Sequence, residues 1–279
     1  MITNATGYSQ SRGVKLLETA LQEFGPIFTL DQLKPLARDQ QLSDTHLRFL
    51  ISSLASADWI EIIKRGTYVV KSSLYSGDIP PFAIAAALIQ PVAISHWSAC
   101  SQHGFTTQPP TMVQASTPKK VITPEMRIGK AHSPRGRATW QAFGTEFEFI
   151  HVRQDVFWGF EKHWVSSWQQ VNITDPERTA LDLIARPDIF GGVSAAIEIL
   201  ENAFGQIKLN RLVKYALKYD TGSVIKRLGW ALEKLGVDGE TLEPLQNYPV
   251  KGYYPMDPNL EADAPKNIRW RVLENLGRS

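Results

Sequence analysis

The 279-residue sequence has one cysteine, Cys100, and lacks any apolar run long enough to span a bilayer. A single cysteine excludes an internal disulfide framework and is typical of a protein from a reducing compartment. The longest apolar stretch, residues 79–92, is interrupted by Gln90 and Pro91, whereas a membrane helix needs about 20 apolar residues. The first residues, MITNATGYSQSRG, lack the basic and apolar regions of a signal peptide. We therefore expect a cytoplasmic protein with no membrane partner.

An excess of charge of one sign is also absent. The 30 basic residues stand against 28 acidic residues, which gives a net charge of +2. This balance excludes the global basic field by which many nucleic-acid-binding proteins attract their ligand, so contact with DNA would have to come from local charge. A hydrophobic content of 43% is typical of a globular protein, and the length suffices for two domains.

The motifs that mark common enzymes and metal sites are missing. The six histidines and the cysteine show no zinc-ligand spacing, and no glycine-rich phosphate loop occurs. Ser98, Cys100, His96 and His103 lie close together in ISHWSACSQHGFTTQPP, but no nucleophile elbow surrounds them. We predict that this segment is a helix ending at His103-Gly104, with glycine in the left-handed position. We also predict that the chain has no catalytic residue, metal or cofactor, and that it is not an enzyme.

Two helices are predicted at the start of the chain. The first covers Ser11–Phe24, because apolar residues recur there at three- and four-residue steps until Gly25-Pro26 ends the pattern. A short extended piece leads into the second helix, which contains Pro35. We place Pro35 in the first turn, where a missing N–H costs no helical hydrogen bond.

A third helix and a hairpin follow. Ser43 is a suitable N-cap, and an apolar stripe runs along the helix at Leu47, Leu50, Ile51 and Leu54. Residues 59–64 alternate as a strand, Arg65-Gly66 form a two-residue turn, and residues 67–70 return. Three helices and a hairpin in this order predict a winged helix-turn-helix domain over residues 1–75.

The face opposite the apolar stripe is polar and suits DNA recognition. Arginine reads guanine, hydroxyl groups reach several base edges, and an apolar ring contacts the thymine methyl group. The hairpin tip would place basic side chains against phosphates or in a minor groove. Ser56 shares the outer face, and the predicted DNA-binding residues are Thr45, His46, Arg48, Phe49, Ser52, Lys64 and Arg65.

Other interpretations of this region remain open. The outer face can be merely solvated, many winged helices bind proteins, and Phe49 can equally pack under the second helix. Residues 1–75 contain eight Lys and Arg against seven Asp and Glu. We therefore expect modest intrinsic affinity for DNA, helped by pairing of two copies or by basic residues elsewhere.

Residues 80–279 are predicted to form a larger, mixed α+β domain behind the linker KSSLYSGDIPP. Apolar periodicity predicts helices at 79–89, 95–103, 195–204, 209–218 and 224–235, and strands in TMVQAST, ATWQAFG and EFEFIHV. The protein as a whole is thus expected to be of the α+β class.

Basic residues cluster within TPKKVITPEMRIGKAHSPRGR. They are either a solvated surface or a supplementary phosphate-contacting patch, and the residues alone favour neither. The members of this cluster are Lys119, Lys120, Arg127, Lys130, Arg135 and Arg137.

The segment VNITDPERTALDLI contains a strong helix start, with Asp175 as the N-cap and Pro176 at the first helical position. An alternative is a metal-binding cluster of Asp175, Glu177 and Asp182, as in a metal-dependent nuclease. We favour the structural role, because Asp175 serves as a cap, Asp182 fits a surface charge, and no Glu-x-Lys dyad follows.

A second alternative is a protein-interaction module that exposes Trp158, Phe160, Trp164 and Trp168. Large aromatic side chains at this spacing are more often buried in a core, so we expect these four to be buried.

Several of these segments, in order, resemble the bacterial AbiEi antitoxin family. The resemblance covers most of residues 80–275 and is specific in its order more than in any single segment. The matching segments are ISHWSACSQHGFTTQPP, VQASTP, VNITDPERTALDLIARPDIFGG, VIKRLGWALEKLG, and YYPMDPN ahead of KNIRWRVLEN.

The resemblance implies an N-terminal winged helix joined to an antitoxin domain, in the antitoxin of a type IV toxin–antitoxin system. The partner would be a nucleotidyltransferase-like toxin that is counteracted without a stable complex. The winged helix would repress the shared operon by binding inverted repeats of double-stranded DNA in its promoter, with the outer face of residues 43–56 and Lys64-Arg65 as contacts. One feature differs from this expectation. The winged helix has few basic residues, whereas tight DNA binding by this domain alone would need more of them.

Overall fold

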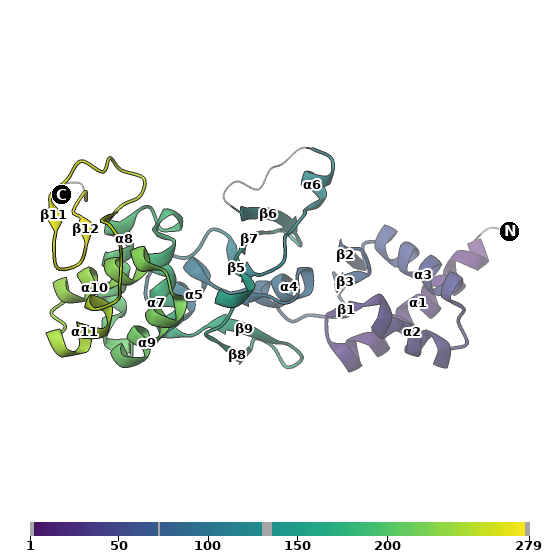
Figure 1. The fold of residues 1–279 in the computed structure, drawn as a ribbon. Helices are drawn as coiled ribbons and strands as arrows, with labels where there is room; N and C mark the ends of the chain where they lie inside the picture. Colours follow the sequence, from purple (N-terminus) through teal and green to yellow (C-terminus); the bar gives the residue numbers. More distant parts are fainter. Residues whose placement is uncertain (1–2, 72, 130–135, 277–279) are drawn as a thin grey trace. The chain divides into compact units, whose positions relative to one another are not determined.

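A computed structural model describes residues 3–71, 73–129 and 136–276 of the chain. The protein is mixed α+β, with several sheets (Figure 1). The chain divides into two compact units, the first formed by residues 1–92, 119–151 and 162–171, and the second by residues 93–118, 152–161 and 172–279. The boundary predicted near residues 76–80 lies inside the first unit, and independent folding of residues 1–75 stays a prediction.

The first unit begins with three helices and a three-stranded sheet, here called the N-terminal module. β1 is antiparallel to β3, β3 is antiparallel to β2, and the strand order is β1-β3-β2. The predicted helices and hairpin are thus present, and the short extended piece is a strand of the same sheet. The elements are α1 (Thr3–Phe24), β1 (Ile27–Thr29), α2 (Leu30–Asp39), α3 (Asp44–Ser56), β2 (Ile60–Lys64) and β3 (Thr67–Val70).

The start of α2 corrects the predicted position of Pro35. The Thr29 hydroxyl accepts a hydrogen bond from the backbone N–H of Gln32, and the Gln32 side chain accepts one from the backbone N–H of Thr29. This reciprocal capping box starts the helix at Leu30. Pro35 therefore lies in the helix interior, on the exposed side, where water can bind the carbonyl that lacks a helical donor.

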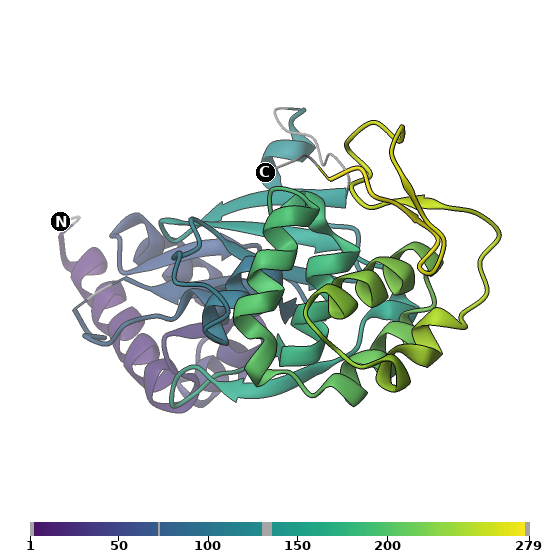
Figure 2. The same ribbon diagram turned by 90° about the vertical axis from the view of Figure 1, so that its left-hand side faces the viewer.

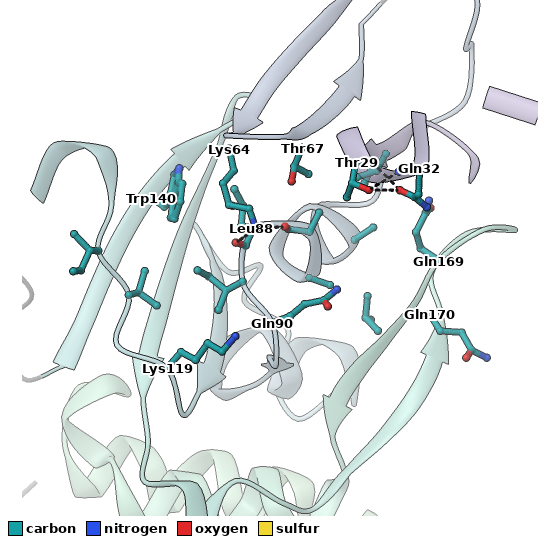
Figure 3. A pocket seen from close by; sticks show the side chains of 18 of the residues that line it. Thr29, Gln32, Lys64, Thr67, Leu88, Gln90, Lys119, Trp140, Gln169 and Gln170 are labelled. Carbon is teal, nitrogen blue, oxygen red and sulfur yellow. Dashed lines mark hydrogen bonds between the residues drawn. The ribbon is translucent and has the colours of Figure 1, made fainter. Parts of the chain in front are cut away.

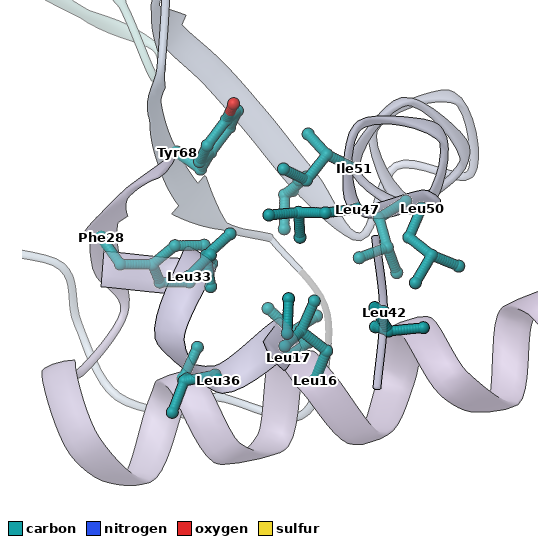
Figure 4. Close-up of a cluster of buried hydrophobic side chains, with 14 of the residues drawn as sticks. Leu16, Leu17, Phe28, Leu33, Leu36, Leu42, Leu47, Leu50, Ile51 and Tyr68 are labelled. Carbon is teal, nitrogen blue, oxygen red and sulfur yellow. The ribbon is translucent and has the colours of Figure 1, made fainter. Parts of the chain in front are cut away.

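The apolar stripe of α3 faces the core of the module, as predicted. Leu47, Leu50, Ile51 and Leu54 are all buried, against α1, α2 and the sheet (Figure 4). The other buried members of this core are Leu16, Leu17, Ala20, Phe28, Leu33, Leu36, Ala37, Leu42, Ile60, Tyr68 and Val70. Burial of this face leaves the opposite face of α3 at the surface.

The rest of the first unit contributes a helix, a hairpin and a single helical turn. The hairpin strands are antiparallel, with Arg137 opposite Ile150 and Ala142 opposite Thr145. Its tip is tied to the N-terminal module, because the backbone N–H of Phe143 donates to the Glu61 carboxylate at 2.7 Å. These elements are α4 (Pro81–Leu88), α6 (Pro124–Arg127), β6 (Arg137–Ala142) and β7 (Thr145–His151). β8 (Phe160–Trp164) runs across the boundary between the units.

Among its described residues, the second unit contains β4, β5, most of β9, the last three strands of the chain and six α-helices. β4 is antiparallel to β5 and parallel to β9, with Ile94 opposite Ala115 and Ile173. The helix α7 packs against α5, α8, α9 and α10, and nearly all of its residues are buried. Figure 2 shows α8, α9 and α10 in green. The elements are β4 (Ala93–Ile94), α5 (His96–Gln102), β5 (Val113–Thr117), β9 (Gln170–Thr174), α7 (Pro176–Ala185), α8 (Val193–Ala203), α9 (Leu209–Tyr219), α10 (Gly222–Lys234) and α11 (Gly239–Gln246).

The last part of the chain forms a small sheet beside α10. β12 (Val272–Leu273) pairs in parallel with β10 (Tyr254–Pro255) and antiparallel with β11 (Lys266–Asn267). The Trp270 ring is completely buried and donates its indole N–H to Glu233 at 2.7 Å. Within the described part of the chain, no helix is long and apolar enough to span a membrane.

The contact between Gly229 and Trp270 gives a test of the packing. A methyl group on Gly229 would overlap the Trp270 ring, which is completely buried. Alanine normally stabilises a helix relative to glycine, but we expect Gly229→Ala to lower the free energy of unfolding by about 1–3 kcal/mol because of overpacking. Urea unfolding measures the change. Gly205→Ala, which meets open space, is the control, and an unchanged or raised stability of Gly229→Ala would contradict the packing.

Candidate nucleic-acid interface

The outer face of α3 is exposed to solvent. Ser43 caps the helix, because its hydroxyl accepts a hydrogen bond from the backbone N–H of His46 at 3.2 Å. The His46 side chain itself is half-buried. The hydroxyl, guanidinium and phenyl groups named from the sequence therefore share one accessible surface. Its exposed residues are Thr45, Arg48, Phe49, Ser52 and Ser56.

Phe49 does not pack under α2. Its side chain is 59% exposed, and its ring makes an edge contact with the His46 ring at a centroid distance of 6.4 Å. The alternative left open from the sequence is thereby decided in favour of exposure. An exposed phenyl group beside hydroxyls offers the apolar contact that a thymine methyl group requires.

A groove of about 510 Å³ runs between α3 and the hairpin. Arg48 and Ser52 line it from α3, while Ile62 and Tyr68 line it from the strands. Burial raises the pKa of the Tyr68 hydroxyl, and the positive charge of Arg48 opposes that rise. Ile62 is 51% exposed. The sequence analysis missed Ile62 and Tyr68, because strict alternation along the strand does not show the register shift between Ile62 and Lys64.

The two basic residues of the hairpin have different roles. The Lys64 ammonium donates to the carbonyls of Ala87 and Leu88, at 3.0 and 2.8 Å, and so caps the C-terminal end of α4. Burial and the charge of Lys119 lower the Lys64 pKa. Lys64 therefore has a structural role at the end of α4, and its contact with DNA stays a prediction. Arg65 is exposed at the turn and remains the candidate contact of the hairpin.

Part of the predicted phosphate patch gathers around one cavity. Lys119, Lys120 and Arg127 are exposed and line this cavity together with Lys64. Figure 3 shows Lys64 and Lys119. The sequence indicated the first three, because they lie within nine residues of one another. It gave no indication of Lys64, which comes from a strand more than fifty residues earlier.

The remaining members of the patch do not join this group. Arg137 forms a bidentate pair with Glu148, with Nε to Oε1 at 2.7 Å and Nη2 to Oε2 at 3.1 Å. Arg137 thus forms an ion pair across the hairpin, and its part in a phosphate-contacting patch stays a prediction. Lys130 and Arg135 lie outside the described residues.

The segment around Asp175 folds as a buried helix start. The Asp175 carboxylate accepts a hydrogen bond from the backbone N–H of Arg178 at 2.8 Å, and Pro176 is the first helical residue, as predicted. Asp182 is not the surface charge that we expected. Its side chain is 4% exposed and pairs with the equally buried Arg178 at 2.9 Å.

A second arginine, Arg211, pairs with the acidic residues at the start of α7. The Arg211 guanidinium lies 2.6 Å from the Asp175 carboxylate and 3.4 Å from that of Glu177, and the Tyr215 hydroxyl donates to Asp175 at 2.8 Å. The acidic residues of the nuclease alternative are thus held by arginines. Among the described residues, no group of three or more histidines, cysteines or carboxylates could hold a metal ion.

Two N-cap aspartates provide a matched pH test. Burial raises the pKa of Asp175, whereas hydrogen bonds from Thr241 lower that of Asp238, the N-cap of α11. A raised pKa contributes stability that is fully present below about pH 4 and is lost as pH rises through the folded pKa. A lowered pKa contributes stability that is present above about pH 4 and is lost as pH falls.

We therefore expect Asp175→Asn to gain stability relative to the wild type as pH rises from about 4 to 7, because only the wild type must ionise a buried carboxyl. Asp238→Asn should instead lose stability relative to the wild type as pH rises from about 2 to 5. Urea unfolding at each pH gives both differences. If the stability differences of both variants from the wild type changed in the same direction with rising pH, the environments assigned to Asp175 and Asp238 would be contradicted.

The nucleophilic residues near His96 are held in structural roles. The Ser98 hydroxyl accepts a hydrogen bond from the backbone N–H of Gln114 at 2.9 Å. Burial, with a further contribution from the Asp182 carboxylate, raises the pKa of the Cys100 thiol to about 12. His103 bonds the carbonyl of Thr174 at 2.6 Å and ends α5, and Gly104 follows in the left-handed conformation, as predicted.

The four aromatic residues of the interaction-module alternative are not in a core. Trp164 is 66% exposed, Trp168 is 41% exposed, and Trp158 and Phe160 are half-buried. The expectation of burial is wrong; for Phe160 and Trp164 the reason is that β8 buries neither face fully. Trp168 makes an edge contact with Tyr75 at a centroid distance of 6.0 Å.

Comparison with known proteins gives the fold but no family. No protein-family model and no curated protein matches this chain. The chain is similar to the crystal structure of the RV2827C protein from Mycobacterium tuberculosis, with a TM-score of 0.63 and 13% sequence identity over 94% of this chain and 91% of that chain. At this identity the likeness shows that the two proteins share an α+β fold.

Proposed function

We propose that the protein is a DNA-binding autorepressor and the antitoxin of a type IV toxin–antitoxin system. In this proposal the N-terminal module is a winged helix-turn-helix, with α3 as the recognition helix and the β2–β3 hairpin as the wing. The observation that carries the DNA-binding part is the exposed face of α3, which combines Arg48 and Phe49 with the hydroxyls of Thr45 and Ser52. These groups supply the donors and the apolar contact used in major-groove readout.

The groove between α3 and the hairpin also supports DNA binding. Arg48 lies at this groove, and Arg65 is exposed at the tip of the hairpin beside it. A recognition helix in the major groove would place this tip along the adjacent backbone. One exposed arginine in the hairpin supplies few phosphate contacts, so we expect pairing of two copies on an inverted repeat to provide the remaining affinity.

The antitoxin part of the proposal depends on the resemblance of residues 80–275 to the AbiEi family. The protein would act in the cytoplasm against a nucleotidyltransferase-like toxin, without turnover of its own. The ion pairs around Asp175 and Asp182 are consistent with this, because they neutralise the carboxylates that a nuclease would use for metal binding.

Arginine variants test the DNA-binding face. We expect Arg48→Ala to weaken binding to the promoter fragment by about 1–3 kcal/mol more than binding to random DNA, because it removes a base contact. Arg65→Ala should weaken both equally and reduce the salt slope by about one, because it removes a phosphate contact. Fluorescence anisotropy at several salt concentrations measures both effects. Lys15→Ala, on α1, removes the same charge as a control, and equal promoter affinity of all four proteins would overturn the assignment.

A double variant separates repression from toxin neutralisation. Thr45→Ala with Arg48→Ala leaves the buried face of α3 intact, so the chain should fold normally. We expect a promoter–reporter fusion to be derepressed while the variant still rescues growth of cells that express the partner toxin. Circular dichroism and protein levels control for folding and abundance. A folded variant that fails to rescue growth would show that neutralisation needs the α3 face and would contradict the division of roles.

A further inference from the structure

A cavity of about 680 Å³ lies in the first unit (Figure 3). Its walls come from β1, the β2–β3 hairpin, α4 and the segments around residues 119–127 and 169–171. This volume falls within the range of about 300–1,000 Å³ that is typical of sites for small molecules. The groove beside α3 shares no lining residue with it, so the two sites are distinct.

The charge of the cavity wall is of one sign. Lys64, Lys119, Lys120 and Arg127 line it, and none of the described residues that line it is acidic. The chain as a whole has nearly equal numbers of acidic and basic residues, so this wall is a local concentration of positive charge. Such a concentration in a concave surface attracts small anions.

The positive charges of two of these lysines, Lys64 and Lys119, repel each other. The Lys64 side chain extends from β2 into the cavity, and its ammonium donates to the carbonyl of Leu88 at the end of α4. The Lys119 side chain extends into the cavity from the opposite wall (Figure 3). Burial and the charge of Lys119 both disfavour the charged form of Lys64 and lower its pKa. An anion between the two lysines would remove this repulsion, and a phosphate group has the charge and the acceptors to do so.

The rest of the wall is neutral and partly apolar. Trp140, Ala83 and Ala86 supply apolar surface, and Thr29 and Thr67 supply hydroxyls. Four glutamine side chains, Gln32, Gln90, Gln169 and Gln170, line the same wall. The Gln32 carbonyl already accepts from Thr29, and the Gln169 amide is bonded to Ser166 and Phe24, whereas Gln90 and Gln170 are exposed and can donate and accept hydrogen bonds. A ligand that fits this lining has an anionic end and a flat, hydrogen-bonding, partly apolar body.

We propose that this cavity binds a nucleotide, with Lys119, Lys120 and Arg127 holding its phosphates and the glutamine-rich wall holding its base and sugar. The nucleotide is either free in solution or the 5′-phosphorylated end of a single strand, because both present the same groups. The site does not depend on the proposed binding of duplex DNA, since it uses none of the exposed residues of α3.

Calorimetric titration of the full-length protein tests the site. The probes are the four ribonucleoside triphosphates, pyrophosphate and adenosine, at a constant ionic strength of about 0.15 M. We expect at least one triphosphate to bind more tightly than both pyrophosphate and adenosine, because only the triphosphate fills both parts of the cavity. The absence of binding by every phosphorylated probe would overturn the proposal.

Matched variants locate the binding. Lys119→Gln with Lys120→Gln should weaken triphosphate binding by about tenfold or more, because two charge-assisted contacts are lost. Lys214→Gln with Lys251→Gln removes the same charge from exposed positions in the second unit and should leave binding unchanged. Ala86→Leu, which fills the cavity without changing its charge, should also weaken binding. Equal weakening by the two lysine double variants would overturn the proposal.

Two oligonucleotides separate the possible sources of the nucleotide. A trinucleotide with a 5′ phosphate that competes with the triphosphate, while its 5′-hydroxyl form does not, would support the strand end. Competition by neither form, with binding of the triphosphate retained, would support a free nucleotide. Binding of duplex DNA alone, weakened by Lys119→Gln with Lys120→Gln, would overturn the proposal and make this wall part of the duplex-binding surface.

Discussion

The burial of one face of α3 determines which of its residues meet solvent. Leu47, Leu50, Ile51 and Leu54 are all buried in the core of the N-terminal module. Burying one such side chain contributes about 1.5–3 kcal/mol, so a rotation that exposed all four would cost roughly 6–12 kcal/mol. This is comparable to the whole stability of a domain. The outward position of Arg48 and Phe49 therefore follows from the core and needs no DNA to maintain it.

Charged side chains serve the architecture elsewhere in the chain. Lys64 caps the end of α4, and Lys226 does the same for α11 by donating to the carbonyls of Leu245 and Gln246. Both ammonium groups give donors to the carbonyls that a helix leaves unpaired at its C-terminal end. Arg178 is used in a similar way, because its guanidinium bonds Asp182 and the carbonyls of Val156 and Trp158. These three basic residues thus serve the fold, whereas Lys119, Lys120 and Arg127 are exposed around one cavity.

Local patterns in the sequence predicted most elements and the outer face of α3, because each depends on neighbours within a few residues. The apolar stripe, the Ser43 cap and the Asp175 cap are of this kind. The failures involve partners that are distant in the chain. Lys64 meets α4 more than twenty residues later, and Arg211 meets Asp175 across thirty-six residues. The pair of Arg178 and Asp182 was visible at a spacing of four, but its burial depends on helices packed from elsewhere.

Photo-crosslinking from two exposed aromatic positions tests most directly whether α3 faces DNA. A benzoylphenylalanine at position 49 would stand on the outer face of α3, and one at position 164 would stand on β8 with similar exposure. Irradiation of each full-length protein with the fragment that carries its own promoter should yield a covalent protein–DNA adduct from position 49 and none from position 164. An adduct from position 164 alone, or bound DNA without an adduct from position 49, would contradict the account.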